Sequence, residues 1–310
     1  MESLNRLAIE RVDEALEFAE EFGIGAHELD GGTTVLDFGV DFDGGIEAGL
    51  LLAEVQTGGL ATVSTRTGTV AGAPFPHVEL ETDHPDLALL CAQKAGWELS
   101  VDGFEGLGSG PARALVAAED VYRTVEYADA FDLTALAVES DALPGEAVAE
   151  RVADRTGTEE TGVHLLAFST ASVAGSVTVA ARAAELAVYR LSELGYDPRD
   201  VLTASGSAPM APVAADERTA MARTNDALAY GGQVHLVVRE DADVFDEVVS
   251  TASDEYGRPF REVFEAADWE FASVPREAFA PAQLTVDVVG GPTHVHGGVD
   301  EAVVAESFGL

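Results

Sequence analysis

Four polar side chains recur at helical spacing along an otherwise apolar stretch that begins at Val173. They are Thr178, Arg182, Glu185 and Tyr189, at positions i, i+4, i+7 and i+11. This spacing places the Arg182 guanidinium beside the Glu185 carboxylate on a helix. A surface ion pair, worth a fraction of a kcal/mol, is the interpretation that spacing alone favours. The alternative is a general base that takes a proton from water while the adjacent cation holds its charge and orients the water.

Lys94 is a second candidate, because it is the only lysine in the chain. The sequence holds 17 basic and 56 acidic residues, a net charge of −39, where a small soluble domain usually carries about 2–8 charges. Such self-repulsion strains a compact fold in dilute buffer, whereas near-molar salt shortens the screening length to about 3 Å. We therefore expect a cytoplasmic protein from a salt-loving cell, in which a lone lysine is more readily explained by chemistry than by solubility.

The same acidity excludes several classes of partner. Nucleic acid and anionic membranes are bound by clustered Lys and Arg, and here scattered Arg residues are outnumbered by acids. No segment approaches the roughly 20 apolar residues of a membrane span, and the first residues lack the pattern of a signal peptide. Cys91 is the only cysteine, which predicts a reducing compartment and a small buried side chain.

Two glycine-rich segments and a histidine pair are weaker candidates. Residues 106–111, with Arg113 nearby, and residues 204–209 could each form a nest of backbone N–H groups around an anion. A plain tight turn is the simpler interpretation of both, since neither matches a nucleotide-binding motif. His294 and His296 could share a metal on one face of a strand, but no Cys or further His lies at ligand spacing. We therefore expect no metal site.

Helical and strand-like patterns alternate along the chain. Mixed hairpins and helices predict an α/β (α+β) fold with mixed sheets, and the length suggests about two domains. We expect an N-terminal α/β domain at 1–128 and a second at 129–310, whose C-terminal part could return to the first. The pattern predicts helices over 4–22, 46–54, 145–154, 173–194 and 260–266, a helix opened by residues 83–85, and a short last helix; and strands over 61–70, 77–82, 97–101, 133–138, 163–168, 233–238 and 284–289.

Several short segments occur in an order that points to one family. They are Gly31–Asp37, Glu47–Leu50, Gly58–Ala61, Thr82–Pro85, Ala92–Trp97, Gly108–Ala114, Arg223–Asp226 and Glu306–Leu310. From Leu4 to its C-terminus the sequence resembles the archaeal methenyltetrahydromethanopterin cyclohydrolases. The resemblance implies a homotrimer, with a pterin pocket between two interleaved domains and with neither metal nor redox cofactor.

The resemblance also assigns roles to residues. Arg182, Glu185 and the segment Gln93–Ala95 would be functional, and they coincide with the polar stripe and the lone lysine. Expected contacts with the reduced pterin substrate are Gln93, Ala95, Gly108, Ser109, Gly110, Arg113, Ser172, Thr224, Asn225 and Asp226. Glu185 would take the proton of a water that attacks the methenyl carbon. Arg182 would orient that water, and Lys94 would stabilise the oxygen of the tetrahedral adduct.

Three alternatives stay open. The same reaction could use tetrahydrofolate as the carrier, and the catalytic residues would not reveal which. A non-catalytic protein that binds pterin or phosphate through the glycine loops, or a purely structural oligomer, would need no paired base and cation. The combination of Arg182, Glu185 and Lys94 therefore disfavours both non-catalytic alternatives.

The charge leads to a prediction about salt. At about 0.1 M salt, where the screening length is near 10 Å, repulsion among the acids should unfold the chain or dissociate its oligomer, and added KCl should reverse the change. Circular dichroism and light scattering across a KCl titration measure both effects. A protein that stays folded and assembled in 0.1 M salt would contradict the prediction.

Overall fold

The computed structural model describes residues 2–310 and divides them into two compact units. Unit 1 comprises residues 2–62 and 86–178, and unit 2 comprises residues 63–85 and 179–310. Each unit holds one six-stranded sheet. The division differs from the expected one at residue 128, because the hairpin in residues 62–82 pairs with strand residues 201–209, far along the chain. Local sequence patterns do not report such long-range pairing.

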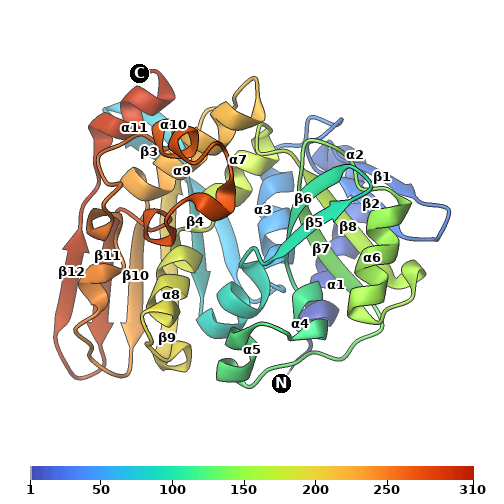
Figure 1. Cartoon of the computed structure of the whole chain (residues 1–310), viewed down its shortest axis with the longest axis horizontal. Coiled ribbons are helices and arrows are strands. Elements are labelled where there is room, and N and C mark those ends of the chain that lie inside the picture. The colour runs from blue at the N-terminus through green and yellow to red at the C-terminus, as the bar shows by residue number, and fades with distance from the viewer. Residues whose placement is uncertain (1) are drawn as a thin grey trace. The chain divides into compact units, whose positions relative to one another are not determined.

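Unit 1 is drawn mainly in blue and green in Figure 1. Its strands are β1 (Gly25–Glu28), β2 (Thr34–Asp37), β5 (Trp97–Val101), β6 (Phe104–Ser109), β7 (Thr134–Glu139) and β8 (Val163–Phe168). Its helices are α1 (Leu4–Glu17), α2 (Ala19–Phe22), α3 (Ile46–Gln56), the π-helix η1 (Asp86–Gln93), α4 (Ala112–Val116), α5 (Asp120–Val125), α6 (Glu146–Thr156), the 3₁₀ turn η2 (Glu160–Gly162) and the greater part of α7 (Val173–Ala180).

The sheet of unit 1 has the order β1-β2-β8-β7-β6-β5. Its centre is parallel, since β8 pairs in parallel with both β2 and β7, and antiparallel hairpins complete both edges. Alternate side chains of β7 enter two different cores: Ala135 and Ala137 pack with α1 and α3, whereas Leu136 and Val138 pack with α6. Helices therefore cover both faces, as a partly parallel sheet requires.

Unit 2 is drawn mainly in yellow, orange and red, with a cyan hairpin (Figure 1). Its strands are β3 (Thr62–Val70), β4 (Ala73–Thr82), β9 (Val201–Pro209), β10 (Gln233–Val238), β11 (Gln283–Val288) and β12 (Thr293–Gly297). Its helices are α8 (Ala183–Glu193), α9 (Glu217–Gly231), α10 (Phe260–Ala266) and α11 (Glu301–Phe308), with 3₁₀ turns at Pro198–Asp200 (η3), Phe245–Glu247 (η4), Ser250–Ala252 (η5), Phe271–Ser273 (η6) and Arg276–Ala278 (η7).

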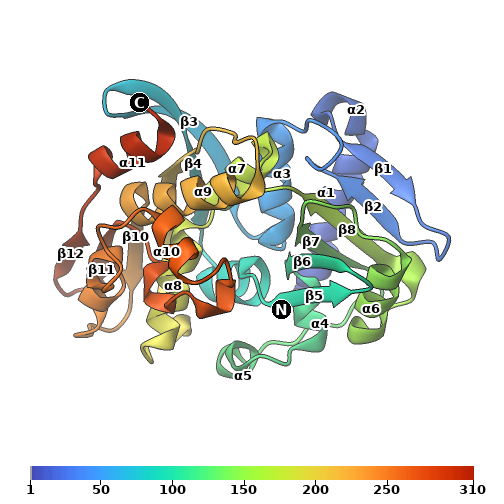
Figure 2. The same cartoon turned by 45° about the horizontal axis from the view of Figure 1, so that its top comes forward.

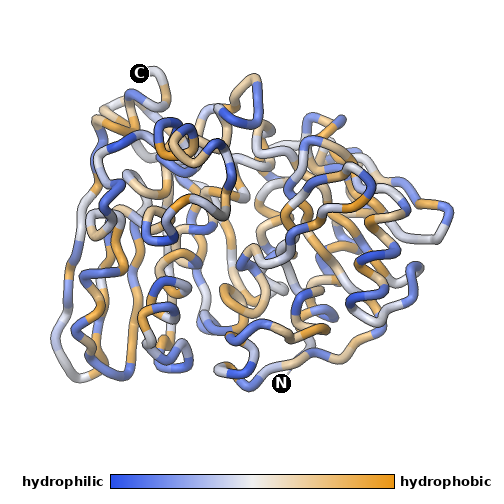
Figure 3. Tube along the Cα trace, in the orientation of Figure 1, coloured by the Kyte–Doolittle hydropathy of each residue, from blue (hydrophilic) through white to orange (hydrophobic). Residues whose placement is uncertain are grey.

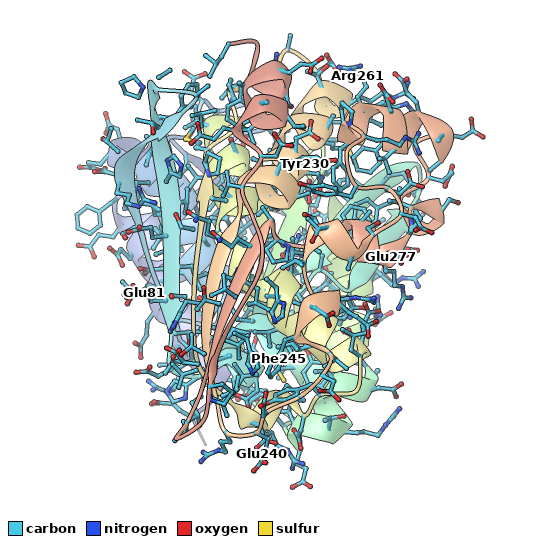
Figure 4. All side chains as sticks on the ribbon, turned by 90° about the vertical axis from the view of Figure 1, so that its left-hand side faces the viewer. Glu81, Tyr230, Glu240, Phe245, Arg261 and Glu277 are labelled. Carbon is cyan, nitrogen blue, oxygen red and sulfur yellow. The ribbon has the colours of Figure 1, made fainter. Side chains whose placement is uncertain are left out.

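The sheet of unit 2 has the order β12-β11-β10-β9-β4-β3 and exposes one of its faces. β10 alternates between buried Val234, Leu236 and Val238 and more exposed residues, and Figure 3 colours this strand mostly hydrophobic. The opposite face carries polar side chains such as Glu81, which projects from β4 on the side away from α9 and α10 (Figure 4). A sheet made mainly of antiparallel pairs can keep one face in water in this way.

The buried face of this sheet is covered by helices. Figures 1 and 2 show α8 beside β9 and β10, and α9 packed between α10 and α11. Asp226 of α9 connects the three helices, because its Oδ1 accepts from the Phe260 N–H at 2.8 Å and its Oδ2 from the Ser307 hydroxyl at 2.6 Å. Tyr230, one turn further along and labelled in Figure 4, donates to the Arg258 carbonyl at 2.6 Å.

The expected helix over 173–194 is wrong in one respect. The structure breaks it into α7 and α8 at Ala181 and Arg182, and the chain passes from unit 1 to unit 2 at Thr178 and Val179, just before the break. α7 is rich in Gly, Ser and β-branched residues, which are weaker helix formers than Ala. The break gives Arg182 the N-cap position of α8, so that Glu185 lies in the first turn of a new helix.

Other expectations about the elements are confirmed. The fold is mixed α/β with two mixed sheets, and the strands at 97–101, 163–168 and 233–238 have the predicted bounds. The N-terminal helix ends at Gly23, whose φ of 65° is left-handed, although the helix is interrupted at Phe18. β6, β9, α4, α5 and α9 were not predicted. Among the described residues, no helix is both long and apolar enough to cross a membrane.

Asp226 gives unit 2 a testable dependence on pH. Burial raises the pKa of this carboxyl from 3.8 to about 6, although bonds from Ser307 and Phe260 act in the opposite direction. The folded state thus keeps a proton that the unfolded chain has lost, and stability falls as pH rises from about 4 to 6. Asp226→Asn should remove this loss, because an amide can accept from Phe260 and donate to Ser307 without a charge.

The stability of the variant relative to the wild type should therefore increase across this window, by up to about 3 kcal/mol for a shift of two pKa units. Denaturant unfolding of both proteins in molar KCl at pH 4, 5, 6 and 7 measures the difference. A difference that stays constant over this range would contradict the assignment of the raised pKa to Asp226.

Candidate functional site

Arg182 and Glu185 form an ion pair at the start of α8. The Nε and Nη2 groups of Arg182 both donate to Oε2 of Glu185, at 3.1 and 2.9 Å. The Arg182 carbonyl accepts the first α8 hydrogen bond, from the Leu186 N–H at 3.0 Å, which places Glu185 at the third helical position. Acids are favoured there because the free N–H groups of a helix start carry positive partial charge. The predicted pair is thus present, as a contact three residues apart.

This ion pair is buried. The Glu185 side chain is 2% exposed and that of Arg182 is 18% exposed, so the pair is not the solvent-screened kind. A buried carboxylate needs partners for its lone pairs, but both donated bonds go to Oε2. Within residues 2–310, no protein group donates a hydrogen bond to the Oε1 of Glu185. That oxygen is available to accept from a water or a substrate.

Gly206 in β9 sets the position of α8. A Cβ atom added to Gly206 would lie 2.7 Å from the Ala184 backbone nitrogen and 3.0 Å from the Ala184 Cβ. Only glycine lets the strand approach the first turn of the helix so closely. Ala184 immediately precedes Glu185, and therefore this contact fixes the height of the carboxylate above the sheet.

The predicted segment Gln93–Ala95 lies in unit 1 at the end of a π-helix. Lys94 N–H donates to the Leu89 carbonyl at 2.8 Å, an i→i−5 bond that closes η1. Residues 83–85 were expected to open an α-helix, whereas the structure has the wider π form, which is rare and frequent at functional sites. Gln93 is fully buried, and the Lys94 side chain is 16% exposed.

Arg113 satisfies the carbonyl groups at the end of this π-helix. Its Nη1 donates to the carbonyls of Lys94 at 2.7 Å, Ala92 at 3.1 Å and Leu90 at 3.4 Å. Its Nε and Nη2 donate to Oε1 of Glu119 at 2.9 and 2.7 Å. The side chain has no exposed surface. Arg113 was predicted to contact substrate, but each of its nitrogens is directed to a protein acceptor, and its evident role is to support the segment.

Glu119 is a residue that the sequence analysis missed. Its Oε2 accepts from the Lys94 ammonium at 3.1 Å while its Oε1 accepts from Arg113. Burial alone would raise the pKa of Glu119, but Arg113 and Lys94 together hold it below its ordinary value. Glu119 lies 25 residues from Lys94 in sequence, and nothing in its local spacing marks it.

The glycine-rich segments form β-strands over most of their length. Gly108 and Ser109 belong to β6, and residues 204–209 lie within β9. Only Gly110, with φ of 113°, turns the chain, and its N–H donates to the Ala92 carbonyl at 2.9 Å. The hydroxyl of Ser109 accepts from the Gln56 amide at 2.9 Å. The structure thereby gathers Gln93, Lys94, Ala95, Gly108, Ser109, Gly110 and Arg113 around the end of η1.

The remaining predicted contact residues have bonds within their own elements. Ser172 caps α7, since its hydroxyl accepts from the Gly175 N–H at 2.9 Å. Thr224 and Asn225 donate back to carbonyls of the preceding turn of α9, and Asp226 holds α10 and α11. No observation tests whether these side chains also contact substrate, and their predicted role stays a prediction.

The structure also places the histidine pair and the cysteine. His294 lies 2.8 Å from an Asp241 carboxylate oxygen, and its ring stacks on that of His296 with centroids 6.0 Å apart. In the part of the chain that the structure describes, no three His, Cys, Asp or Glu side chains are grouped as metal ligands. Cys91 is fully buried in η1, and burial raises the pKa of its thiol to about 12. The prediction of a small buried side chain is confirmed.

Comparison with known proteins decides the family. The family model described as Cyclohydrolase (MCH) matches residues 3–308. The chain belongs to this family. It is 63% identical over 310 residues to the methenyltetrahydromethanopterin cyclohydrolase of Halobacterium salinarum, with both chains fully covered. Proteins of that name from Methanocella arvoryzae and Methanosphaerula palustris are 41% and 39% identical, over all of this chain and at least 99% of theirs.

The approach of β9 to α8 predicts the effect of one methyl group. Gly206→Ala should push the start of α8 away from the sheet, because the contacting atom is backbone and cannot rotate aside. We expect a loss of about 1–3 kcal/mol, typical of overpacking, and a lower turnover because Glu185 moves with Ala184.

Gly298→Ala is the matched control. A Cβ there would meet nothing within 4 Å, and its backbone is not in the left-handed region. Thermal unfolding and turnover of both variants in molar KCl measure the two effects. Equal behaviour of the two variants would show that the close approach does not set the position of α8.

Proposed function

We propose that this chain is a methenyltetrahydromethanopterin cyclohydrolase. It would interconvert the methenyl compound plus water with the formyl compound by attack of water on the methenyl carbon. The family and the names of relatives that match over the whole chain support the reaction. The observation that supports the mechanism is the buried Glu185 carboxylate, with Arg182 on Oε2 and no protein donor on Oε1.

The geometry suits a general base for water. A water that donates to Oε1 of Glu185 would pass its proton to that oxygen while its own oxygen bonds to the methenyl carbon, which is electron-poor between two nitrogens. The tetrahedral adduct then loses one C–N bond. The departing nitrogen takes the proton that Glu185 received, the adduct hydroxyl loses its own proton to solvent as it becomes the formyl oxygen, and the formyl group stays on the other nitrogen. The reverse reaction uses the same groups.

Arg182 has two roles in this proposal. Its two N–H groups on a single oxygen hold the carboxylate in one rotamer, which fixes the direction of Oε1. Its charge also offsets the cost of burying the carboxylate. For Lys94 we propose electrostatic stabilisation of the oxygen that becomes charged in the adduct. Hydrolysis of an activated carbon needs neither a metal nor a redox cofactor, and the pterin derivative is the substrate.

The setting follows from the composition. We propose that the enzyme works in concentrated salt, a proposal supported by the charge of −39 and by the relative from Halobacterium salinarum. A cytoplasmic location and a homotrimer are proposals as well, supported by the sequence features and the resemblance respectively. The assay must also distinguish tetrahydromethanopterin from tetrahydrofolate as the carrier.

One assay tests the function and the base together. The absorbance of methenyltetrahydromethanopterin and of methenyltetrahydrofolate is followed in molar KCl with the wild type and with Glu185→Gln. We expect the wild type to prefer the methanopterin compound, and Glu185→Gln to lose on the order of 10²–10⁴-fold in kcat, as removal of a general base does.

Glu193→Gln is the control on the same helix, since Glu193 is also ion-paired, to Arg276 at 2.9 Å. It should keep nearly full turnover. A Glu185→Gln enzyme with most of its kcat would exclude Glu185 as the base, and a wild type that prefers the folate compound would replace the proposed carrier.

A further inference from the structure

We propose that Glu119 is a positioning residue, which holds the ammonium of Lys94 in place for the reaction. The proposal rests on the function proposed above and adds a residue that neither the sequence pattern nor the comparisons assign. Glu119 touches Lys94, and its action on the substrate would be through that lysine.

The geometry divides the two oxygens of Glu119 between two cations. Oε1 is 2.7 Å from Nη2 and 2.9 Å from Nε of Arg113, and Oε2 is 3.1 Å from Nζ of Lys94. Arg113 is itself fixed by carbonyls of η1 and of Lys94, so that it cannot turn away. The Glu119 carboxylate thereby links the flexible Lys94 side chain to the rigid, buried guanidinium of Arg113.

The packing around the three side chains leaves little freedom. A Cβ at Gly96 would lie 2.6 Å from Nε of Arg113 and 2.9 Å from Oε1 of Glu119, which shows that both groups rest directly on the backbone after Lys94. The ring of Tyr122 lies 5.7 Å from the Arg113 guanidinium carbon on another side. The Gly96 backbone and Arg113 therefore confine Oε1 of Glu119, while the rest of that side chain is partly exposed.

Glu119 balances positive charge at the end of η1. Arg113 and Lys94 carry two positive charges, and both contact the one negative charge of Glu119. The carboxylate neutralises the fully buried Arg113, which could not stay unpaired. Because the Glu119 carboxylate is shared between Arg113 and Lys94, it neutralises the Lys94 ammonium only in part. The ammonium can then still attract an electron-rich oxygen.

Because Lys94 is the only lysine, chemical labelling of amines can test the proposal without a measurement of turnover. A brief pulse of an amine-acylating reagent in molar KCl, followed by peptide mass spectrometry, reports the reactivity of Lys94 separately from the α-amino group. Glu119→Gln should raise the labelling rate several-fold over the wild type, because the ammonium leaves its ordered ion pair. Glu98→Gln, which changes an exposed acid on β5 of the same unit, should leave the rate unchanged.

Kinetics then separate positioning from mere support. Lys94→Ala should lower kcat on the order of 10²-fold, and Glu119→Gln about tenfold. In the Lys94→Ala background, Glu119→Gln should cost less than roughly twofold, since residues that act through one another are not additive. A purely structural role would give the same loss in both backgrounds and would overturn the proposal, as would an unchanged labelling rate.

Glu119→Gln leaves the buried Arg113 without an acid partner. If that variant does not fold for this reason, Glu119→Asp takes its place in the experiment. It keeps the negative charge but is one methylene shorter and cannot reach both cations, and we expect faster labelling with intact circular dichroism. Labelling equal to that of the wild type would again overturn the proposal. If the wild type does not hydrolyse either methenyl pterin, the proposed function fails, and the labelling result still decides whether Glu119 holds Lys94.

Discussion

The burial of one guanidinium is the constraint on which much of unit 1 depends. Arg113 has no exposed side-chain surface, and the unpaired charge would cost several kcal/mol. Its neutralisation needs Glu119, and its remaining N–H groups need the carbonyls that a π-helix leaves open at its end. The wider π-helix, the absence of a side chain at Gly96 and the position of Lys94 are consequences of accommodating this one group.

A comparison of the two buried ion pairs distinguishes support from chemistry. Glu119 has a cation on each of its oxygens, Arg113 on Oε1 and Lys94 on Oε2. Glu185 receives both bonds from Arg182 on one oxygen, and its other oxygen has no protein donor among the described residues. A carboxylate with a donor on each oxygen stabilises a fold, whereas a carboxylate with one oxygen free of protein donors is suited to bind a water. The same pair of residue types thus serves two purposes, according to how the bonds are shared.

Much of the fold and half of the site follow from local sequence. The strand Val163–Phe168 is an apolar run interrupted only by His164, and its bounds were predicted correctly. β9 was missed because its small residues are dictated by α8 packed against Gly206, a tertiary demand that strand propensity does not describe. The Arg182–Glu185 pair was found because three residues of a helix bring the side chains together. Glu119, the partner of Lys94, was not found, since a contact between residues 25 positions apart leaves no local signal in the sequence.

The acidity of the chain and its buried charges are separate problems. Dissolved ions screen charges that face water, within a few ångströms at molar salt, but they do not enter a fully buried pair. The repulsion among surface acids is therefore relieved from outside, while Arg113 and Glu185 depend on partners supplied by the chain itself. The surface can then change its acid content without a change at these pairs.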